Sequence, residues 1–218
     1  MKNLNPLINK LIAHRGIHNE YVKENSLLAI EKAVQKDYPI EIDVILTKDK
    51  KIILFHDLII KDRNNHEYFI NNLTYEQIKK IHSYIPTLEE VLNFISGKVP
   101  LLIELKPYNK VPHLEKEIVK YLDKYEGYFA IQSFNPLSVY WFKKHRKNYI
   151  RGQLLTANYR YNFFTSFLYK HIIFNKLISP NFISYNIKGL PNEKIQKIRK
   201  KIIILGWTIK NQRAVIKI

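Results

Sequence analysis

The sequence predicts an α/β fold built on a parallel sheet, of the (β/α)8 barrel type. Short apolar runs alternate with amphipathic segments along the whole chain, which is typical of successive β-α units. Seven of the apolar runs are candidates for parallel strands, one fewer than a closed barrel needs. No stretch rich in Pro, Gly or Ser divides the 218 residues, so we expect one domain over residues 1–218.

The strand candidates are runs of β-branched and other apolar residues with polar residues on either side. They are Leu11–Ala13, Ile40–Leu46, Lys51–Phe55, Pro100–Leu105, Tyr128–Ser133, Ile150–Leu155, Phe182–Tyr185 and Ile202–Ile209. The polar "LTKDKK" at residues 46–51 allows only a tight turn, so the strand ending at Phe55 should return antiparallel to the one before it. That strand is therefore an excursion and not one of the seven.

Helix starts are marked by local signals. Over residues 26–36, one face of a helix packed on a sheet is indicated by the spacing of Leu27, Ile30, Ala33 and Val34. Asn25 and Ser26 can cap this helix, and Gly16 allows an unusual backbone angle shortly before it. Two further helices should begin at capping boxes, formed by Thr74 with Gln77 and by Thr87 with Glu90.

Composition limits the partners and the chemistry. A formal net charge of +17 favours phosphate-bearing partners, but the lysines are scattered and we do not expect direct binding of nucleic acid. No cysteine is present, which excludes disulfides, thiolate metal sites and cysteine nucleophiles. The first 16 residues lack the continuous apolar stretch of a signal peptide, and no run is long enough for a membrane span, so a cytoplasmic location is expected.

Two pairs of polar residues fall on predicted strands. Glu41 and Asp43 are two residues apart and face the same side of one strand, as do Glu104 and Lys106 of another. If both strands belong to one parallel sheet, three carboxylates and a lysine meet where barrel enzymes build their sites. Such carboxylates suit a hard cation, Mg²⁺ or Ca²⁺. The alternative for the first pair is the solvent face of an amphipathic edge, which the second pair disfavours.

Two histidines also end apolar strands. His14 and His56 should therefore reach the same rim as the carboxylates and are candidates for acid/base chemistry. Arg15 and Lys106 would add positive charge suited to a phosphate in the substrate. The remaining histidines lie in predicted loops or helices and are read as structural or surface residues: His18, His66, His82, His113, His145 and His171.

An ordered set of short motifs resembles the glycerophosphodiester phosphodiesterase family. From Leu11 to about Asn211 the chain contains "HRG", "EN", "EIDV", "T-x-D", "HD", "IPTLEEVL", "IELK", "SF" and "WT", in that order. The resemblance implies a (β/α)8 barrel with a small insertion at about residues 58–85, after the second strand. It also implies hydrolysis of glycerophosphodiesters to sn-glycerol 3-phosphate and an alcohol, with a divalent cation.

The resemblance implies roles for nine side chains. It implies that Glu41, Asp43 and Glu104 are metal ligands and that His14 and His56 are an acid/base pair. It also implies that Arg15 and Lys106 bind the phosphate and that Phe134 and Trp207 are apolar walls of a glycerol pocket. For the last two, plain core packing is an equal alternative.

The sequence departs from the family pattern after "WT-x-N", because no last strand with an "ITD"-like motif follows before Ile218. We expect a barrel that lacks its last strand, through natural truncation or frameshift, an artificial end point, or closure by a second copy. Two other functions stay open. One is a phospholipase D-like enzyme that acts on intact lipids, to which peripheral contact with an anionic membrane would contribute, and the other is a non-catalytic phosphate- or lipid-binding relic.

Overall fold

A computed structural model describes residues 3–108, 111–156 and 178–209. The chain divides into two compact units, with Asn3–Ala130 in the first and Ile131–Ile218 in the second. Each unit has a buried apolar cluster. The cluster of the first unit is built from isoleucines of its strands and helices, and that of the second includes Leu155, Ile183, Tyr185 and Ile195.

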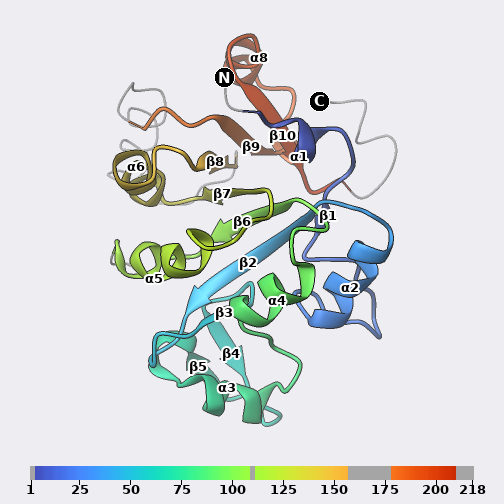
Figure 1. Cartoon of the computed structure of the whole chain (residues 1–218), viewed down its shortest axis with the longest axis vertical. Helices are drawn as coiled ribbons and strands as arrows, with labels where there is room; N and C mark the ends of the chain where they lie inside the picture. Colours follow the sequence, from blue (N-terminus) through green and yellow to red (C-terminus); the bar gives the residue numbers. More distant parts are fainter. Residues whose placement is uncertain (1–2, 109–110, 157–177, 210–218) are drawn as a thin grey trace. The chain divides into compact units, whose positions relative to one another are not determined.

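The first unit alternates short strands with helices (Figure 1). Its elements are α1 (Asn5–Ile8), β1 (Ala13–His14), α2 (Leu27–Gln35), β2 (Ile40–Leu46), β3 (Ile52–Leu54), β4 (Ile59–Lys61), β5 (Glu67–Phe69), the 3-10 helix η1 (Ile70–Asn72), α3 (Tyr75–Ile81), α4 (Leu88–Ile95), β6 (Leu101–Leu105), α5 (His113–Leu122) and the start of β7 (Phe129–Ser133). The predicted strands of this unit are confirmed except that the first, predicted over Leu11–Ala13, is shorter and lies at Ala13–His14. The hairpin of β4 and β5 is an addition that the sequence patterns did not predict.

The sheet of the first unit is parallel except for one strand. Strand β2 pairs in parallel with β1 and with β6, and the register sets Asp43 opposite Glu104. Strand β3 runs antiparallel to β2, with Val44 opposite Leu54, which confirms the predicted excursion. The parallel pairing of β2 with β6 ends at Val44, so the last residues of β2 extend beyond the parallel sheet to pair with β3.

Helix α2 begins as predicted, but its buried face is turned relative to the prediction. Ser26 is the N-cap and its hydroxyl accepts a hydrogen bond from the Ala29 amide. Ala29, Ile30 and Ala33 are fully buried, whereas Leu27 is 37% exposed. Two small alanines let the helix pack closely on the sheet, and at 100° per residue this leaves Leu27 on the edge of the buried stripe. The prediction that Leu27 belongs to the packed face is therefore wrong.

Both predicted capping boxes are present. The Thr74 hydroxyl accepts from the Gln77 amide at 3.3 Å, and the Gln77 side chain accepts from the Thr74 amide at 2.9 Å. Thr87 and Glu90 exchange the equivalent bonds at 3.2 and 2.7 Å. Each pair satisfies two amides at the start of a helix, which is how four sequence positions fix the starts of α3 and α4.

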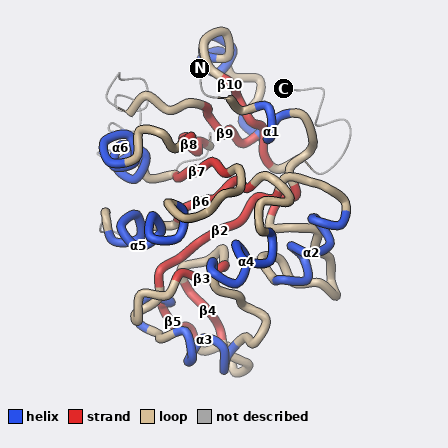
Figure 2. The backbone as a smooth tube through the Cα atoms, viewed as in Figure 1, coloured by secondary structure: helices blue, strands red, loops and turns tan. Residues whose placement is uncertain are grey.

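Residues between β3 and α4 form a small structure of their own, with β4, β5, η1 and α3 grouped at one end of the unit (Figure 2). Its apolar side chains join those of β2 and β3 in one cluster, made of Ile45, Ile53, Ile60, Ile70, Ile78 and Ile85. Tyr108 ties this segment to the end of β6, because its hydroxyl donates to the Leu58 carbonyl at 3.1 Å and accepts from the Asn71 amide at 3.0 Å.

The second unit continues the same alternation. It contains the end of β7, α6 (Pro136–His145), β8 (Ile150–Leu155), β9 (Phe182–Asn186), the 3-10 helix η2 (Ile187–Gly189), α8 (Glu193–Ile198) and β10 (Ile203–Trp207). Strand β9 pairs in parallel with β8 and with β10. The prediction of a missing last strand concerns the chain after β10, where residues 210–218 lie outside the described part, and it stays a prediction. Among the described residues, no helix is both long and apolar enough to cross a membrane.

Candidate active site

The register of β2 and β6 brings three carboxylates together. Asp43 lies opposite Glu104, and Glu41 precedes Asp43 by two residues on the same strand. One oxygen from each carboxylate lies within 4.8 Å of the other two, and the exposed fractions of the three residues are 5% for Glu41, 0% for Asp43 and 7% for Glu104. The predicted pairing of the two acidic motifs is thus present in the fold, and the solvent-face alternative is excluded by this burial.

The negative charges of the three carboxylates repel one another. Burial raises the pKa of Glu41 well above its ordinary value, and the charges of Asp43 and Glu104 add to the rise. Burial also raises the pKa of Glu104 to about 7, against the lowering effect of Lys106 and with the help of Asp43. A hard divalent cation would relieve this mutual repulsion, and three carboxylate oxygens form a fitting ligand set for one.

Two cations lie against Asp43. Lys106 Nζ is 3.2 Å from Asp43 Oδ1 and donates to Glu104 Oε1 at 2.8 Å. Arg15 Nε is 3.1 Å from Asp43 Oδ2, while Arg15 Nη1 donates to Glu24 Oε1 at 2.8 Å. Burial acts to raise the pKa of Asp43, but Lys106 and Arg15 together hold it below its usual value. Asp43 is therefore the ionised centre of the cluster.

His14 lies beside this cluster at the end of β1. Its Nε2 is 3.9 Å from Glu41 Oε2, and the amide of the next residue, Arg15, donates to the same oxygen at 3.2 Å. Burial, together with the neighbouring charge of Arg15, lowers the pKa of His14 to about 4. The imidazole is therefore neutral at pH 7 and can accept a proton or a hydrogen bond.

His56 follows the antiparallel strand β3. The Phe55 amide donates to the Asp43 carbonyl at 3.2 Å, so the backbone returns to β2 one residue before His56. His56 Nδ1 is 2.7 Å from Asp57 Oδ1. A carboxylate in this position fixes the orientation of an imidazole. Asp57 was not predicted as a site residue, although it is the second letter of the "HD" motif.

Asn25 is a second residue whose part in the site was missed. It was predicted to help cap α2, but Ser26 alone does so, and Asn25 instead lies 2% exposed against Asp43. Asn25 Nδ2 donates to Asp43 Oδ2 at 3.0 Å, and Asn25 Oδ1 accepts from the Asp43 amide at 3.2 Å. Its φ of 56° lies in the left-handed region, which Asn tolerates better than most residues. The sequence feature that could have indicated this role is the position of Asn25 directly before the N-cap Ser26.

Phe134 and Trp207 contact each other within the second unit. Their ring centroids are 5.8 Å apart with an interplanar angle of 80°. The Trp207 indole N–H is buried and has no hydrogen-bond partner in the described part of the unit. A buried donor without a partner is costly, and a ligand oxygen would satisfy it. Of the remaining histidines, His171 lies outside the described residues, and the others are not part of the carboxylate cluster.

Parallel strands that bring carboxylates, two cations and two histidines to one place define an enzyme of the β/α barrel type. The chain belongs to the glycerophosphoryl diester phosphodiesterase family, whose model matches residues 14–217. It is accordingly a phosphoric diester hydrolase.

Relatives and solved structures agree with this assignment. YhdW of Bacillus subtilis (strain 168) is 29% identical over 229 residues, which cover 95% of this chain and 89% of the relative. A glycerophosphodiester phosphodiesterase of Caldanaerobacter subterraneus subsp. tengcongensis is 35% identical over 150 residues, covering 62% of this chain and 61% of the relative. The structure of an Oleispira antarctica phosphodiesterase in complex with the product sn-glycerol-3-phosphate is 23% identical, has a TM-score of 0.75, and covers 94% of this chain and 87% of that one. The shared fold is the TIM-type α/β barrel.

Proposed function

We propose that this chain hydrolyses glycerophosphodiesters to sn-glycerol 3-phosphate and an alcohol, using Mg²⁺ or Ca²⁺. The observation that carries the proposal is the meeting of Glu41, Asp43 and Glu104 in one buried cluster against Arg15 and Lys106. Carboxylates that can hold a hard cation and positively charged side chains that can bind a phosphate then lie side by side, as hydrolysis of a phosphate diester requires.

The carboxylates of Glu41, Asp43 and Glu104 would hold the cation. When bound, it withdraws electron density from a phosphate oxygen and makes a nearby hydroxyl or water more acidic. Arg15 and Lys106 bind the remaining phosphate oxygens and offset the charge that grows in the transition state.

The two histidines divide the proton transfers. His14 is neutral at pH 7 and accepts the proton of the attacking water or substrate hydroxyl. His56, oriented by Asp57, donates a proton to the oxygen of the leaving alcohol. When water attacks, the P–O bond to that alcohol breaks as the new P–O bond forms, and sn-glycerol 3-phosphate is the direct product. When a glycerol hydroxyl attacks, a cyclic phosphate forms as the alcohol leaves. A water molecule then opens this ring, with the two histidines in exchanged roles.

Phe134 and Trp207 are proposed to line the glycerol pocket. An aromatic pair offers an apolar surface to the glycerol carbons, and the unpaired indole N–H offers a donor to a glycerol hydroxyl. We further propose that residues 1–218 act as one cytoplasmic domain with residues 58–85 as an insertion.

Matched substitutions test this assignment. Glu41→Gln and His56→Asn should each abolish hydrolysis of glycerophosphocholine while the circular dichroism spectrum is retained. His66→Asn is the control, because His66 also pairs with an aspartate, Asp62 Oδ2 at 3.1 Å, but lies on the β4–β5 hairpin. Retained hydrolysis in Glu41→Gln or His56→Asn would refute the roles assigned to these residues.

One observation favours a second candidate, a phospholipase D-like enzyme that acts on intact lipids. Leu58, Tyr68 and Phe69 in the 58–85 segment are exposed by 38%, 38% and 54%, and exposed apolar side chains of this kind favour peripheral contact with a membrane. Turnover of intact phospholipid in anionic liposomes is compared with turnover of the deacylated diester. Faster turnover of the intact lipid would favour the second candidate, and chelator-sensitive turnover of either would exclude a non-catalytic relic.

A further inference from the structure

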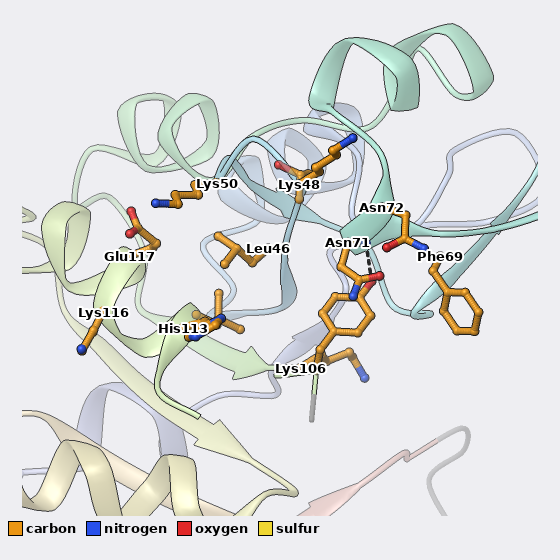
Figure 3. Close-up of a pocket in the computed structure, with 13 residues that line it drawn as sticks. Leu46, Lys48, Lys50, Phe69, Asn71, Asn72, Lys106, His113, Lys116 and Glu117 are labelled. Carbon is orange, nitrogen blue, oxygen red and sulfur yellow. Dashed lines mark hydrogen bonds between the residues drawn. The ribbon is translucent and has the colours of Figure 1, made fainter. Parts of the chain in front are cut away.

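A pocket of about 820 Å³ opens in the first unit and shares one lining residue, Lys106, with the candidate active site. It lies between the β2–β3 turn, the η1 segment and the first turn of α5 (Figure 3). Leu46 and His113 lie at its centre in this view, with Lys50 and Glu117 on one side and Asn71 on the other. Lys106 belongs to both places, because it lines the pocket and also donates to Glu104.

The charged side chains that line this pocket are mostly positive. Four lysines line it, Lys48, Lys50, Lys106 and Lys116, and Glu117 is the one acid in the lining among the described residues. Glu117 is already paired with Lys120, which lies outside the lining. Lys48, Lys50 and Lys116 have no ion-pair partner in the part of the chain that the structure describes.

The remaining lining suits a ligand with a carbon skeleton as well as a charge. Leu46, Leu114 and Phe69 supply apolar walls, and Asn71 and Asn72 supply amide side chains. Lysine stems are long and flexible, so ammonium groups at the rim can turn toward a bound anion. The volume is well above what a glycerol moiety alone would fill.

We propose that this pocket binds an anionic group in the alcohol half of the substrate, so that the preferred substrates are glycerophosphodiesters whose alcohol carries a further phosphate. The inference rests on the proposed function. A diester phosphate held by Lys106 at the carboxylate cluster directs one of its two ester arms into the pocket. The glycerol half is common to all substrates of this kind, so the charge of the pocket distinguishes among alcohols. A choline ammonium would instead be repelled by these lysines.

Binding separates the three types of alcohol. Three diesters are titrated calorimetrically, each by itself, into the His56→Asn chain in the presence of Mg²⁺: glycerophosphocholine, glycerophosphoglycerol, and glycerophosphoglycerol phosphorylated on its alcohol half. The His56→Asn chain is used because it should not consume the ligand. We expect the phosphorylated diester to bind at least about tenfold more tightly than the other two at low salt, and its advantage to shrink as salt is added.

Substitution of the lysines tests where the preference arises. Lys50→Met with Lys116→Met should bring the phosphorylated diester to within about threefold of the neutral one. Lys36→Met with Lys124→Met is the matched control, since it removes the same charge at exposed positions outside the lining and should leave the preference intact. Equal binding of the two diesters, or equal loss in both double variants, would overturn the pocket inference alone.

Turnover distinguishes the pocket from the proposed function. These rates are measured in chains that carry His56. The neutral diester should be hydrolysed at a similar rate by the wild-type chain and by the Lys50→Met, Lys116→Met variant, whereas kcat/KM for the phosphorylated diester should be about tenfold lower in the variant. Hydrolysis of all diesters without discrimination would leave the proposed function standing and overturn the pocket. Absence of both binding and hydrolysis of every diester would overturn the two together.

Discussion

Asn25 and Asp43 are joined by two hydrogen bonds, one from the Asn25 amide group to the Asp43 carboxylate at 3.0 Å and one from the Asp43 backbone amide to Asn25 Oδ1 at 3.2 Å. The side chain of one residue thus fixes both the backbone and the carboxylate of the other. Since Asp43 also pairs with Arg15 and Lys106, its position controls both the proposed cation ligands and the proposed phosphate-binding groups.

Removal of the Asn25 side chain should reduce activity without unfolding the protein. Asn25→Gly keeps the left-handed backbone free of strain and removes both bonds to Asp43. We expect kcat/KM, or the affinity for the activating cation, to fall by about 10- to 100-fold, as is usual for groups that orient metal ligands. Asn19→Gly, outside the cluster, serves as the control in the same assay, and wild-type kinetics in Asn25→Gly would contradict the positioning role.

A divalent cation should stabilise the fold. At a concentration about 100 times Kd, a bound ion contributes about 2.7 kcal/mol, which for a chain of this size raises Tm by roughly 5 to 10 °C. Glu104→Gln should remove most of this shift, and the matched Glu117→Gln should not. A chelator should abolish hydrolysis in parallel. An equal shift in Tm for both variants would show that the ion binds elsewhere.

The cation effect should also weaken in acid. The pKa of Glu104 is about 7, so this acid carries a proton below neutral pH when no ion is bound, and burial shifts the pKa of Glu41 upward as well. Protons then compete with the ion, and the shift in Tm should shrink between pH 7.5 and about pH 5.5. Thermal melts across this range, with and without Mg²⁺, measure the effect. A shift that stays constant with pH would contradict protonated ligands.

Gly16 should be intolerant of any side chain. Its φ is +77°, and a Cβ there would lie 2.6 Å from the Ala29 carbonyl oxygen in α2. The strain and the close contact together predict that Gly16→Ala destabilises the protein by about 3 kcal/mol in urea unfolding. Gly97 is the matched control, because its φ is +76° but the nearest atom to an added Cβ is 3.5 Å away. Gly97→Ala should therefore cost about 1 kcal/mol, and equal losses would show that backbone strain alone acts.

Trp207 should report on ligand binding. The chain has two tryptophans, so Trp141→Phe leaves the Trp207 emission alone. Adding sn-glycerol 3-phosphate to this variant should change that emission, because a glycerol oxygen would accept from the buried indole N–H. Trp207→Phe keeps the contact with Phe134 but removes the donor, so KM for glycerophosphocholine should rise by roughly fivefold. Unchanged emission and unchanged KM would favour plain core packing for this pair.

Strand positions could be read from the sequence because apolar runs in a parallel sheet are bounded by polar residues on both sides. The two-residue period of a strand, a local feature, places Glu41 beside Asp43 and Glu104 beside Lys106. That the two pairs meet depended on the further prediction that both strands belong to one parallel sheet, which the alternation of strands and helices favours. The capping boxes are equally local. These features were predicted correctly for that reason.

Features that depend on approach between distant segments could not be predicted in this way. Asn25 reaches Asp43 across 18 positions of sequence, and its local pattern favoured a helix cap. The exposed position of Leu27 depends on how closely two alanines bring α2 to the sheet. The basic pocket gathers lysines from the β2–β3 turn and from α5, which are scattered along the chain.

The attachment of the 58–85 segment has a consequence for how such enzymes could be diversified. Tyr108 fastens the segment with one hydroxyl, two residues after Lys106, and isoleucines pack it against β2 and β3. The β2–β3 turn adds two hydrogen bonds, from the Lys48 amide to the Leu73 carbonyl at 2.9 Å and from the Tyr75 amide to Asp49 Oδ1 at 3.0 Å. The interface that holds the segment is therefore a small set of hydrogen bonds around a patch of aliphatic carbon. Grafts that keep this interface should therefore alter which alcohols are accepted while the hydrolytic groups stay in place.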